Sequence, residues 1–167
     1  PGDLAGRLII VPVVNMPCLQ FRMPWFNLSK SISPMDGLDI NRGRVFPGDL
    51  NGTVTRVVAY KLLHDIILKS DYHVDLRGGD VDESHLVHTI FLRIGEKIDK
   101  KCEKMAKVFG FEYVLPGTPE IGHTSKGTLI YETVTRGIPS IISESGLGYR
   151  TQPLENYIKL HVKGVKN

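Results

Sequence analysis

Several residues suited to chemistry stand in a strand-like segment near the middle of the chain. Residues 72–80 read YHVDLRGGD. Because side chains alternate along a strand, His73, Asp75 and Arg77 share one face. The two glycines that follow would let a ligand, or another stretch of backbone, approach closely. The segment therefore predicts either part of a binding site or a buried Asp–Arg ion pair at the end of a strand.

A turn-rich stretch earlier in the chain places a carboxamide beside a guanidinium. Residues 36–42 read DGLDINR, which puts Asn41 directly before Arg42. Such a pair can grip a carboxylate through parallel, charge-assisted hydrogen bonds. The alternative is an ordinary turn in which Arg42 pairs with Asp36 or Asp39. The local sequence leaves both interpretations open.

Glu144 follows an apolar run and stands just before Gly146. Burial at such a strand end would raise the pKa of this carboxyl toward the range that is useful for proton transfer. The alternative is an exposed glutamate in a turn.

Other reactive residue types give weaker patterns. Of the six histidines, His85 and His88 have a spacing that a metal site could use. They stand in a polar stretch that we expect to be an exposed loop. No glycine-rich phosphate loop and no GxSxG turn occurs. Neither Cys18 nor Cys102 has an adjacent histidine, which argues against a cysteine nucleophile.

The elements expected to position these residues alternate along the chain. Apolar runs predict strands at residues 7–14, 72–77, 112–115 and 139–143, and helical periodicity predicts helices at 53–70, 97–109, 129–136 and 154–162. This alternation predicts an α/β fold, with a mainly parallel or mixed twisted sheet covered by helices on both faces. Ligands of such sheets bind beyond the carboxyl ends of the strands. That edge should gather the loop after Val14, the turn at residues 75–79 and Glu144.

Composition limits the classes of function. The 167 residues, 41% of them hydrophobic, predict one domain over residues 1–167. There is no long apolar run for a membrane span and no basic stripe for nucleic acid, although the net charge is +3. Two cysteines cannot build a disulfide framework, so we expect a reducing, cytoplasmic setting. The chain lacks an initial Met and enters an apolar run by Leu8, so we expect a truncated piece of a longer protein.

The order of the segments resembles the succinylglutamate desuccinylase/aspartoacylase family, a branch of the carboxypeptidase-like zinc hydrolases. The segments are LAGRLIIVPVVN, SPMDGLDINRGRVFPGD, SDYHVDLRGGD and GTLIYETVTRGIPSIISESGLG. The resemblance covers residues 4–167 and implies a zinc-carboxypeptidase-like catalytic core. It implies hydrolysis of the amide bond of an N-acyl amino acid or a related small carboxylate. A zinc ion held by two histidines and a glutamate would activate the water.

The resemblance also assigns roles to single residues. Glu144 matches the catalytic general base, and Asn41 and Arg42 match the clamp for the substrate carboxylate. Lys30 is the nearest candidate for a basic residue that polarises the substrate carbonyl. An apparent insertion before FPG offers Arg44 as another substrate-binding residue.

The expected zinc ligands are missing from the sequence. Two of them belong to an HG-x-E motif that this chain does not contain. The third is the histidine of a DLH triplet, where this chain has Arg77, which has no lone pair to donate to a metal. His73 lies on the same face and substitutes only if the strand shifts.

Three interpretations follow. Either the chain is the core of a zinc-dependent deacylase and is inactive as it stands, or it is a metal-free module that binds small carboxylates. A structural or regulatory domain without pocket chemistry is the third. We expect a small-molecule carboxylate as partner, and association into a homo-oligomer through exposed strand edges.

Overall fold

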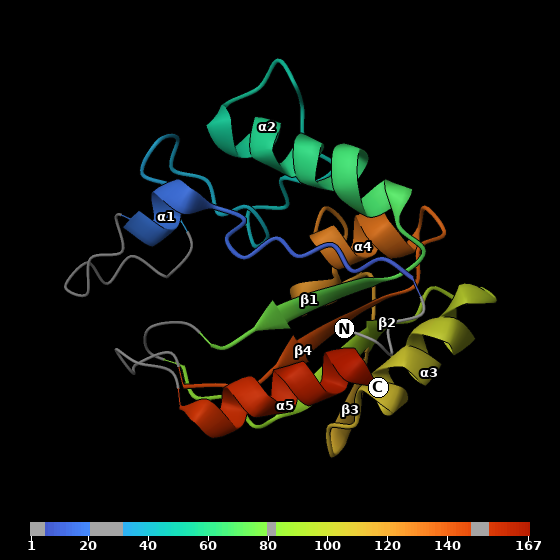
Figure 1. Cartoon of the computed structure of the whole chain (residues 1–167). Helices are drawn as coiled ribbons and strands as arrows, with labels where there is room; N and C mark the ends of the chain where they lie inside the picture. Colours follow the sequence, from blue (N-terminus) through green and yellow to red (C-terminus); the bar gives the residue numbers. More distant parts are fainter. Residues whose placement is uncertain (1–5, 21–31, 80–82, 148–153) are drawn as a thin grey trace.

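The computed structural model describes residues 6–20, 32–79, 83–147 and 154–167. A sheet of four strands lies at the centre, with helices packed against it (Figure 1). The predicted α/β class with a mixed sheet is confirmed. In these described ranges, no helix is both long and apolar enough to cross a bilayer.

The sheet brings the ends of three strands to one edge. Its strands are β1 (His73–Arg77), β2 (His88–Leu92), β3 (Tyr113–Gly117) and β4 (Ser140–Glu144), in the order β1-β4-β2-β3. Strand β4 runs parallel to β1 and antiparallel to β2, while β2 and β3 are parallel. The register pairs Glu144 with Arg77 on one side and with His88 on the other. The carboxyl ends of β1 and β4 therefore meet the start of β2.

The described residues contain the four predicted helices and one short helix, at residues 16–20, that the periodicity did not predict. They are α1 (Met16–Gln20), α2 (Val54–Lys61), α3 (Ile98–Phe109), α4 (Leu129–Val134) and α5 (Glu155–Lys166). A π-helical turn at Leu62–Ile66 and a 3-10 turn at Ile67–Lys69 continue α2. Another 3-10 turn, Gly122–Thr124, precedes α4. Gly110 ends α3 in the left-handed conformation that glycine accepts at a helix C-terminus.

Two hydrophobic clusters hold the layers together. One lies around β2 and β4 and includes Phe91, Ile141 and Ile142. The other packs Val45 and Phe46 against the helical segment that begins at α2. Burying a side chain of this size contributes about 1.5–3 kcal/mol. All five residues of β4 are buried, the apolar Ile141 and Ile142 together with the polar Ser140, Ser143 and Glu144.

The loop that carries Asn41 is anchored to the start of α2. The carboxylate of Asp36 accepts hydrogen bonds from the backbone N–H of Thr55 (2.8 Å) and from its hydroxyl (2.7 Å). Burial acts to raise the pKa of Asp36, but hydrogen bonds from Thr53 and Thr55 outweigh it and hold the pKa well below its usual value. Asp36 thus satisfies a backbone donor that the first turn of a helix leaves without an intrahelical partner.

Two strand predictions were wrong. Residues 7–14 do not form a strand, and their apolar side chains are exposed, Ile10 by 70%. No strand in the described ranges pairs with this run, so its β-branched residues have no sheet to join. The second error is β2, a strand of five residues that was not predicted. Residues 80–89 were expected to be a polar loop, but His88 and Thr89 already belong to this strand.

Candidate functional site

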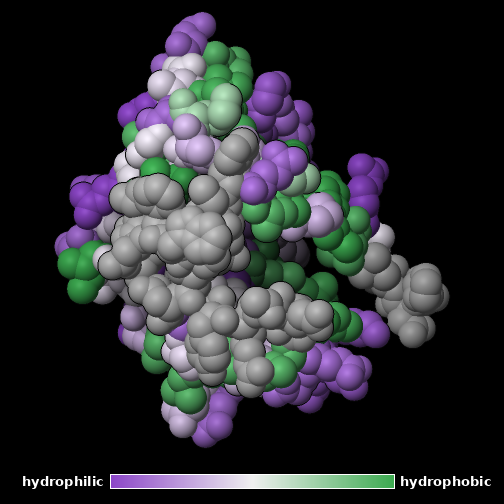
Figure 2. Space-filling view, turned by 90° about the vertical axis from the view of Figure 1, so that its left-hand side faces the viewer, coloured by the Kyte–Doolittle hydropathy of each residue, from purple (hydrophilic) through white to green (hydrophobic). Residues whose placement is uncertain are grey.

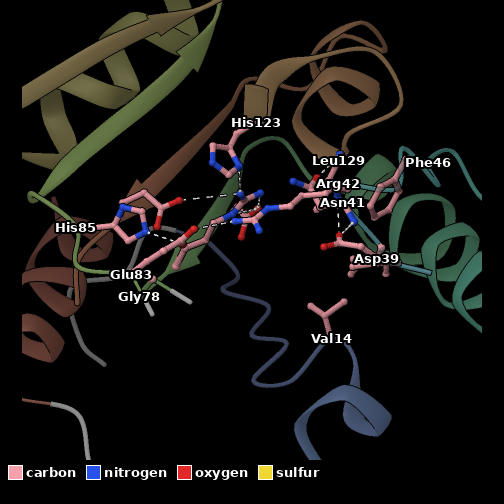
Figure 3. Close-up of a pocket in the computed structure, with 16 residues that line it drawn as sticks. Val14, Asp39, Asn41, Arg42, Phe46, Gly78, Glu83, His85, His123 and Leu129 are labelled. Atoms are coloured by element: carbon pink, nitrogen blue, oxygen red, sulfur yellow. Dashed lines mark hydrogen bonds and ion pairs between the residues drawn. The ribbon is translucent and has the colours of Figure 1, made fainter. Parts of the chain in front are cut away.

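A cavity of about 280 Å³ opens where β1 and β4 end (Figure 3). This is just below the usual range for ligand pockets, roughly 300–1,000 Å³. Figure 2 views the molecule from the side toward which β1 points and shows a hollow with apolar residues at its depth. Within the described part of the chain, the charged and imidazole groups that line the cavity are four carboxylates (Asp39, Asp75, Glu83, Glu144), two guanidiniums (Arg42, Arg77) and two imidazoles (His85, His123).

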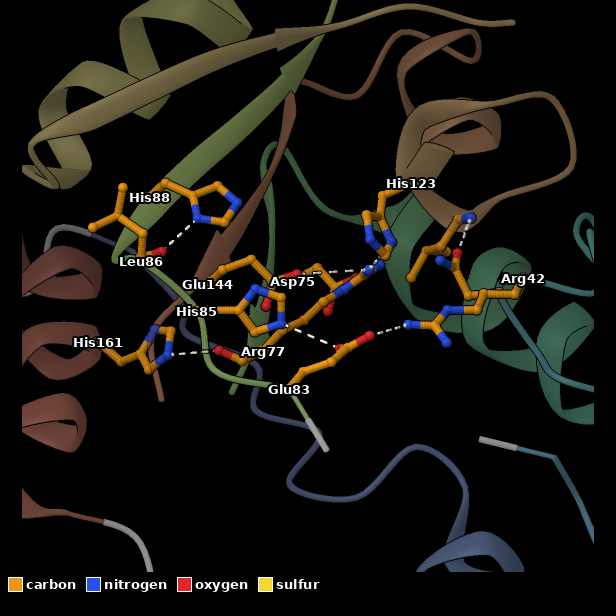
Figure 4. A network of polar contacts seen from close by, with 12 residues as sticks. Arg42, Asp75, Arg77, Glu83, His85, Leu86, His88, His123, Glu144 and His161 are labelled. Atoms are coloured by element: carbon orange, nitrogen blue, oxygen red, sulfur yellow. Dashed lines mark hydrogen bonds and ion pairs between the residues drawn. The ribbon is translucent and has the colours of Figure 1, made fainter. Parts of the chain in front are cut away.

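Arg77 is the centre of the polar network (Figure 4). Its Nε and Nη2 donate to the Asp75 carboxylate at 2.9 and 2.6 Å, and its Nη1 lies 3.1 Å from Nδ1 of His123. Burial acts to raise the pKa of Asp75, but Arg77 outweighs it and lowers that pKa. Burial, and then Arg77, lower the pKa of His123. A neutral His123 can accept a hydrogen bond from the Arg77 N–H. The Asp75–Arg77 ion pair, one of the two interpretations that the sequence left open, is formed.

Glu144 is buried beside this network. Its side chain is 4% exposed, and Oε1 lies 4.0 Å from Nη1 of Arg77. Burial raises the pKa of Glu144, and the opposing effect of Arg77 only partly offsets it. The exposed-turn interpretation is wrong. A carboxyl in this state can exchange a proton nearer neutral pH than an exposed glutamate can.

Asn41 and Arg42 line the same cavity but are already engaged. The side-chain oxygen of Asn41 accepts a hydrogen bond from the backbone N–H of Leu129 (3.2 Å), at the start of α4. Arg42 pairs with Glu83 (3.1 Å) rather than with an aspartate of its own loop. Asp39 instead accepts from the backbone N–H groups of Asn41 and Arg42. A ligand carboxylate would therefore share the Arg42 guanidinium with Glu83.

Comparison with known proteins finds relatives that share this fold. No protein-family model matches the chain. It is 38% identical over 115 residues to N-alpha-acetyl-L-2,4-diaminobutyric acid deacetylase of Halomonas elongata, a match that covers 68% of this chain and 31% of that protein. A succinylglutamate desuccinylase/aspartoacylase from Rhodobacter sphaeroides aligns with a TM-score of 0.74 and 25% identity, over 93% of this chain and 41% of that one. The chain belongs to the succinylglutamate desuccinylase/aspartoacylase family.

Two further solved structures show how far the likeness extends. The product-bound ectoine utilization protein EutE (DoeB) of Ruegeria pomeroyi aligns with a TM-score of 0.80 and 25% identity, over 98% of this chain and 46% of that one. A succinylglutamate desuccinylase from Silicibacter sp. TM1040 shares the fold, with a TM-score of 0.82, 24% identity and coverage of 99% and 46%. The chain thus spans less than half the length of these desuccinylase/aspartoacylase structures.

Three residues assigned from the family resemblance are not among the described residues that line the cavity. Lys30 lies outside the described residues. Arg44 is exposed and does not line the cavity. His73 stands at the far end of β1 from Arg77, where its Nδ1 lies 2.7 Å from the hydroxyl of Ser140. The described structure therefore gives Arg44 and His73 no place in the pocket.

Three of the charged and imidazole groups in the lining were not assigned to a pocket from the sequence. Glu83 and His85 belong to the lead-in to β2, and His85 Nε2 lies 3.3 Å from Glu83. The backbone N–H of His85 donates to the carbonyl of Gly146 (3.3 Å), which fixes this lead-in against the end of β4. Recognising β2 as an antiparallel neighbour of β4 would have placed both at this edge. We find no sequence signal that singles out His123.

The described residues do not fit the zinc ion that the family resemblance implies. Among them, no group of three or more His, Cys, Asp or Glu side chains could hold a metal ion. Where the DLH histidine was expected, the guanidinium of Arg77 is bonded to Asp75 and lies 4.0 Å from Glu144. A fixed positive charge at this place repels a divalent cation.

Proposed function

We propose that the pocket binds an N-acylated diamino acid, a small ligand that carries an ammonium group as well as a carboxylate. The observation that carries this proposal is the charge of the lining. Among the described residues that line the cavity, four carboxylates face two guanidiniums, which leaves a formal charge of −2 before either histidine is counted. Protonation of Glu144, whose pKa is raised, would reduce this excess but would not remove it.

This excess of acidic groups favours ligands that carry an ammonium group over simple dicarboxylates. A guanidinium such as that of Arg42, which is 40% exposed, suits the ligand carboxylate. A simple dicarboxylate would face the excess of acidic groups, whereas an ammonium group would be attracted to it. The relative from Halomonas elongata is named for a deacetylase of an N-acetylated diamino acid, a ligand of this kind.

Hydrolysis of the ligand's amide bond is the second candidate, and Glu144 favours it. This carboxyl is buried, has a raised pKa and lines the cavity at the position that matches the family's general base. The described residues provide no metal site, however. For this chain we therefore propose binding without cleavage, and zinc-dependent deacylation only as a candidate activity of a longer protein.

A pair of ligands tests the proposed binding. N-α-acetyl-2,4-diaminobutyrate should bind about tenfold more tightly than N-α-acetyl-2-aminobutyrate, which lacks the ammonium group, as measured by calorimetry at low salt. Arg42→Ala should weaken the binding of both ligands by about tenfold, because both carry the carboxylate. The matched control is Arg93→Ala, at an exposed arginine that does not line the cavity. Equal affinity for the two ligands, or binding of neither, would contradict the proposal.

Metal analysis tests the second candidate. We expect no stoichiometric zinc in the purified chain after incubation with zinc and dialysis. We expect none in Arg77→His either, because one added histidine does not complete a set of three or four ligands. Stoichiometric zinc in either protein would overturn the metal-free interpretation and return hydrolysis to first place.

A further inference from the structure

His161, on α5, joins the ends of two strands beneath the pocket (Figure 4). Its Nε2 lies 3.0 Å from the carbonyl oxygen of Arg77 and 3.3 Å from that of Ser145. Its Nδ1 lies 3.2 Å from the hydroxyl of Ser143. Because Nε2 faces two acceptors, it must carry the proton, and Nδ1 then accepts from Ser143 when the ring is neutral. Burial, which lowers the pKa of His161, favours this neutral form.

The ring of His161 is held in place by its surroundings. It is half-buried and packs against Phe109 and Phe111, with ring centroids 6.4 and 5.8 Å away. Gly164, one turn further along α5, is so close to Phe109 that a Cβ there would lie 2.3 Å from the phenyl ring. The helix is thus docked closely, and His161 has a fixed position relative to the sheet.

The same backbone carries the charged groups of the pocket. The carbonyl of Arg77 accepts a second hydrogen bond, from the backbone N–H of Ser145 (3.0 Å). Arg77 and Glu144 are direct partners in the register of β1 and β4. His161 itself does not line the cavity. Any effect that it has on a ligand must therefore pass through the positions of these two strand ends.

We propose that His161 is a positioning residue of the pocket: by donating a hydrogen bond across the ends of β1 and β4, it sets the spacing between the Arg77 guanidinium and the Glu144 carboxylate. The consequence for ligand affinity rests on the proposed function, whereas the consequence for the spacing does not. Side chains of a site hold their geometry only when the groups behind them are fixed, so loss of this bond should loosen the pocket.

Three variants separate positioning from simple stability. His161→Leu keeps apolar contact with the two phenylalanines and removes the donor, while His161→Gln restores an amide donor. Leu160→Ala is the control, since Leu160 is partly buried against the core from the same helix. The readouts are the melting temperature, the Kd for N-α-acetyl-2,4-diaminobutyrate, and the titration midpoint of Glu144 by carboxyl-carbon NMR. The Glu144 signal is assigned by its disappearance in Glu144→Gln.

We expect His161→Leu to weaken ligand binding by about tenfold and to move the Glu144 midpoint, and we expect His161→Gln to restore most of both. Leu160→Ala should lower the melting temperature at least as much and leave both readouts unchanged. The inference is overturned if His161→Leu leaves the Kd and the Glu144 midpoint unchanged. It is also overturned if Leu160→Ala changes them as much as His161→Leu does. If the wild-type chain binds no ligand, the proposed function fails, and the Glu144 titration alone decides the role of His161.

Discussion

Replacing Arg77 with methionine is expected to lower the free energy of unfolding by about 2–3 kcal/mol at pH 7. The side chains of Arg77 and Asp75 are only 20% and 21% exposed, and they contact each other at 2.6 Å. Methionine fills much of the same space but leaves the Asp75 carboxylate without its cationic partner. Removing one member of a buried pair costs more than the pair contributes, because the remaining charge stays poorly solvated.

The dependence of this loss on pH has a definite sign. In the native chain, burial acts to raise the pKa of Asp75, but Arg77 outweighs it, so the folded pKa lies below the usual 3.8. The pair's contribution is therefore complete above pH 3.8 and is lost as the pH falls through the folded pKa. Without Arg77, burial raises the folded pKa instead. The deficit of the variant should be largest at neutral pH and should shrink on acidification, as Asp75 becomes protonated.

Urea denaturation at several pH values measures this effect. The control is Lys107→Met, which breaks the exposed pair with Glu103 on α3 and should change stability by no more than about 0.5 kcal/mol. Adding Asp75→Asn to Arg77→Met should recover part of the loss, because the buried charge is then removed. If Arg77→Met costs no more than the control at pH 7, the Asp75–Arg77 pair does not stabilise the fold as argued.

Elements with strong local patterns were predicted well. Strands at 72–77 and 139–143 correspond to β1 and β4, and the helix at 97–109 corresponds to α3. The two errors have a common physical origin in pairing. The run at 7–14 has strand composition but no described strand beside it, whereas β2 has a short run that is stabilised by neighbours on both sides. Local composition does not determine which distant segments pair as strands.

The residues of the candidate site were predicted only in part, because some of them are brought together by pairing between distant strands. The rule for the carboxyl ends of strands grouped Arg77 and Glu144 correctly, and Asn41 and Arg42 line the same cavity. Their partners depend on tertiary structure. Arg42 pairs with Glu83, 41 positions along the chain, because β2 returns antiparallel to β4 and carries its lead-in to this edge. The acidic excess on which the proposed ligand depends could therefore be recognised only in the folded chain.

The second large prediction concerns the close approach of Gly146 to Gly78 at this edge of the sheet. Gly146 has φ +154°, and a Cβ placed there would lie 2.6 Å from the carbonyl oxygen of Gly78 and 3.0 Å from its Cα. Both contacts are with backbone, so no side-chain rotation can relieve them. Gly146→Ala should force the ends of β1 and β4 apart and lower the free energy of unfolding by about 3 kcal/mol, measured by urea denaturation.

Gly137→Ala separates this contact from backbone strain. Gly137 has φ +90° but nothing within 4 Å of an added Cβ, so its replacement should cost only about 1 kcal/mol. Because the carbonyl of Gly146 also holds the lead-in that carries Glu83 and His85, Gly146→Ala should weaken ligand binding, whereas Gly137→Ala should not. Equal effects of the two variants on stability and on binding would mean that the contact of Gly146 with Gly78 adds nothing beyond backbone strain. The close approach of Gly78 and Gly146 would then have no part in placing Arg77 beside Glu144.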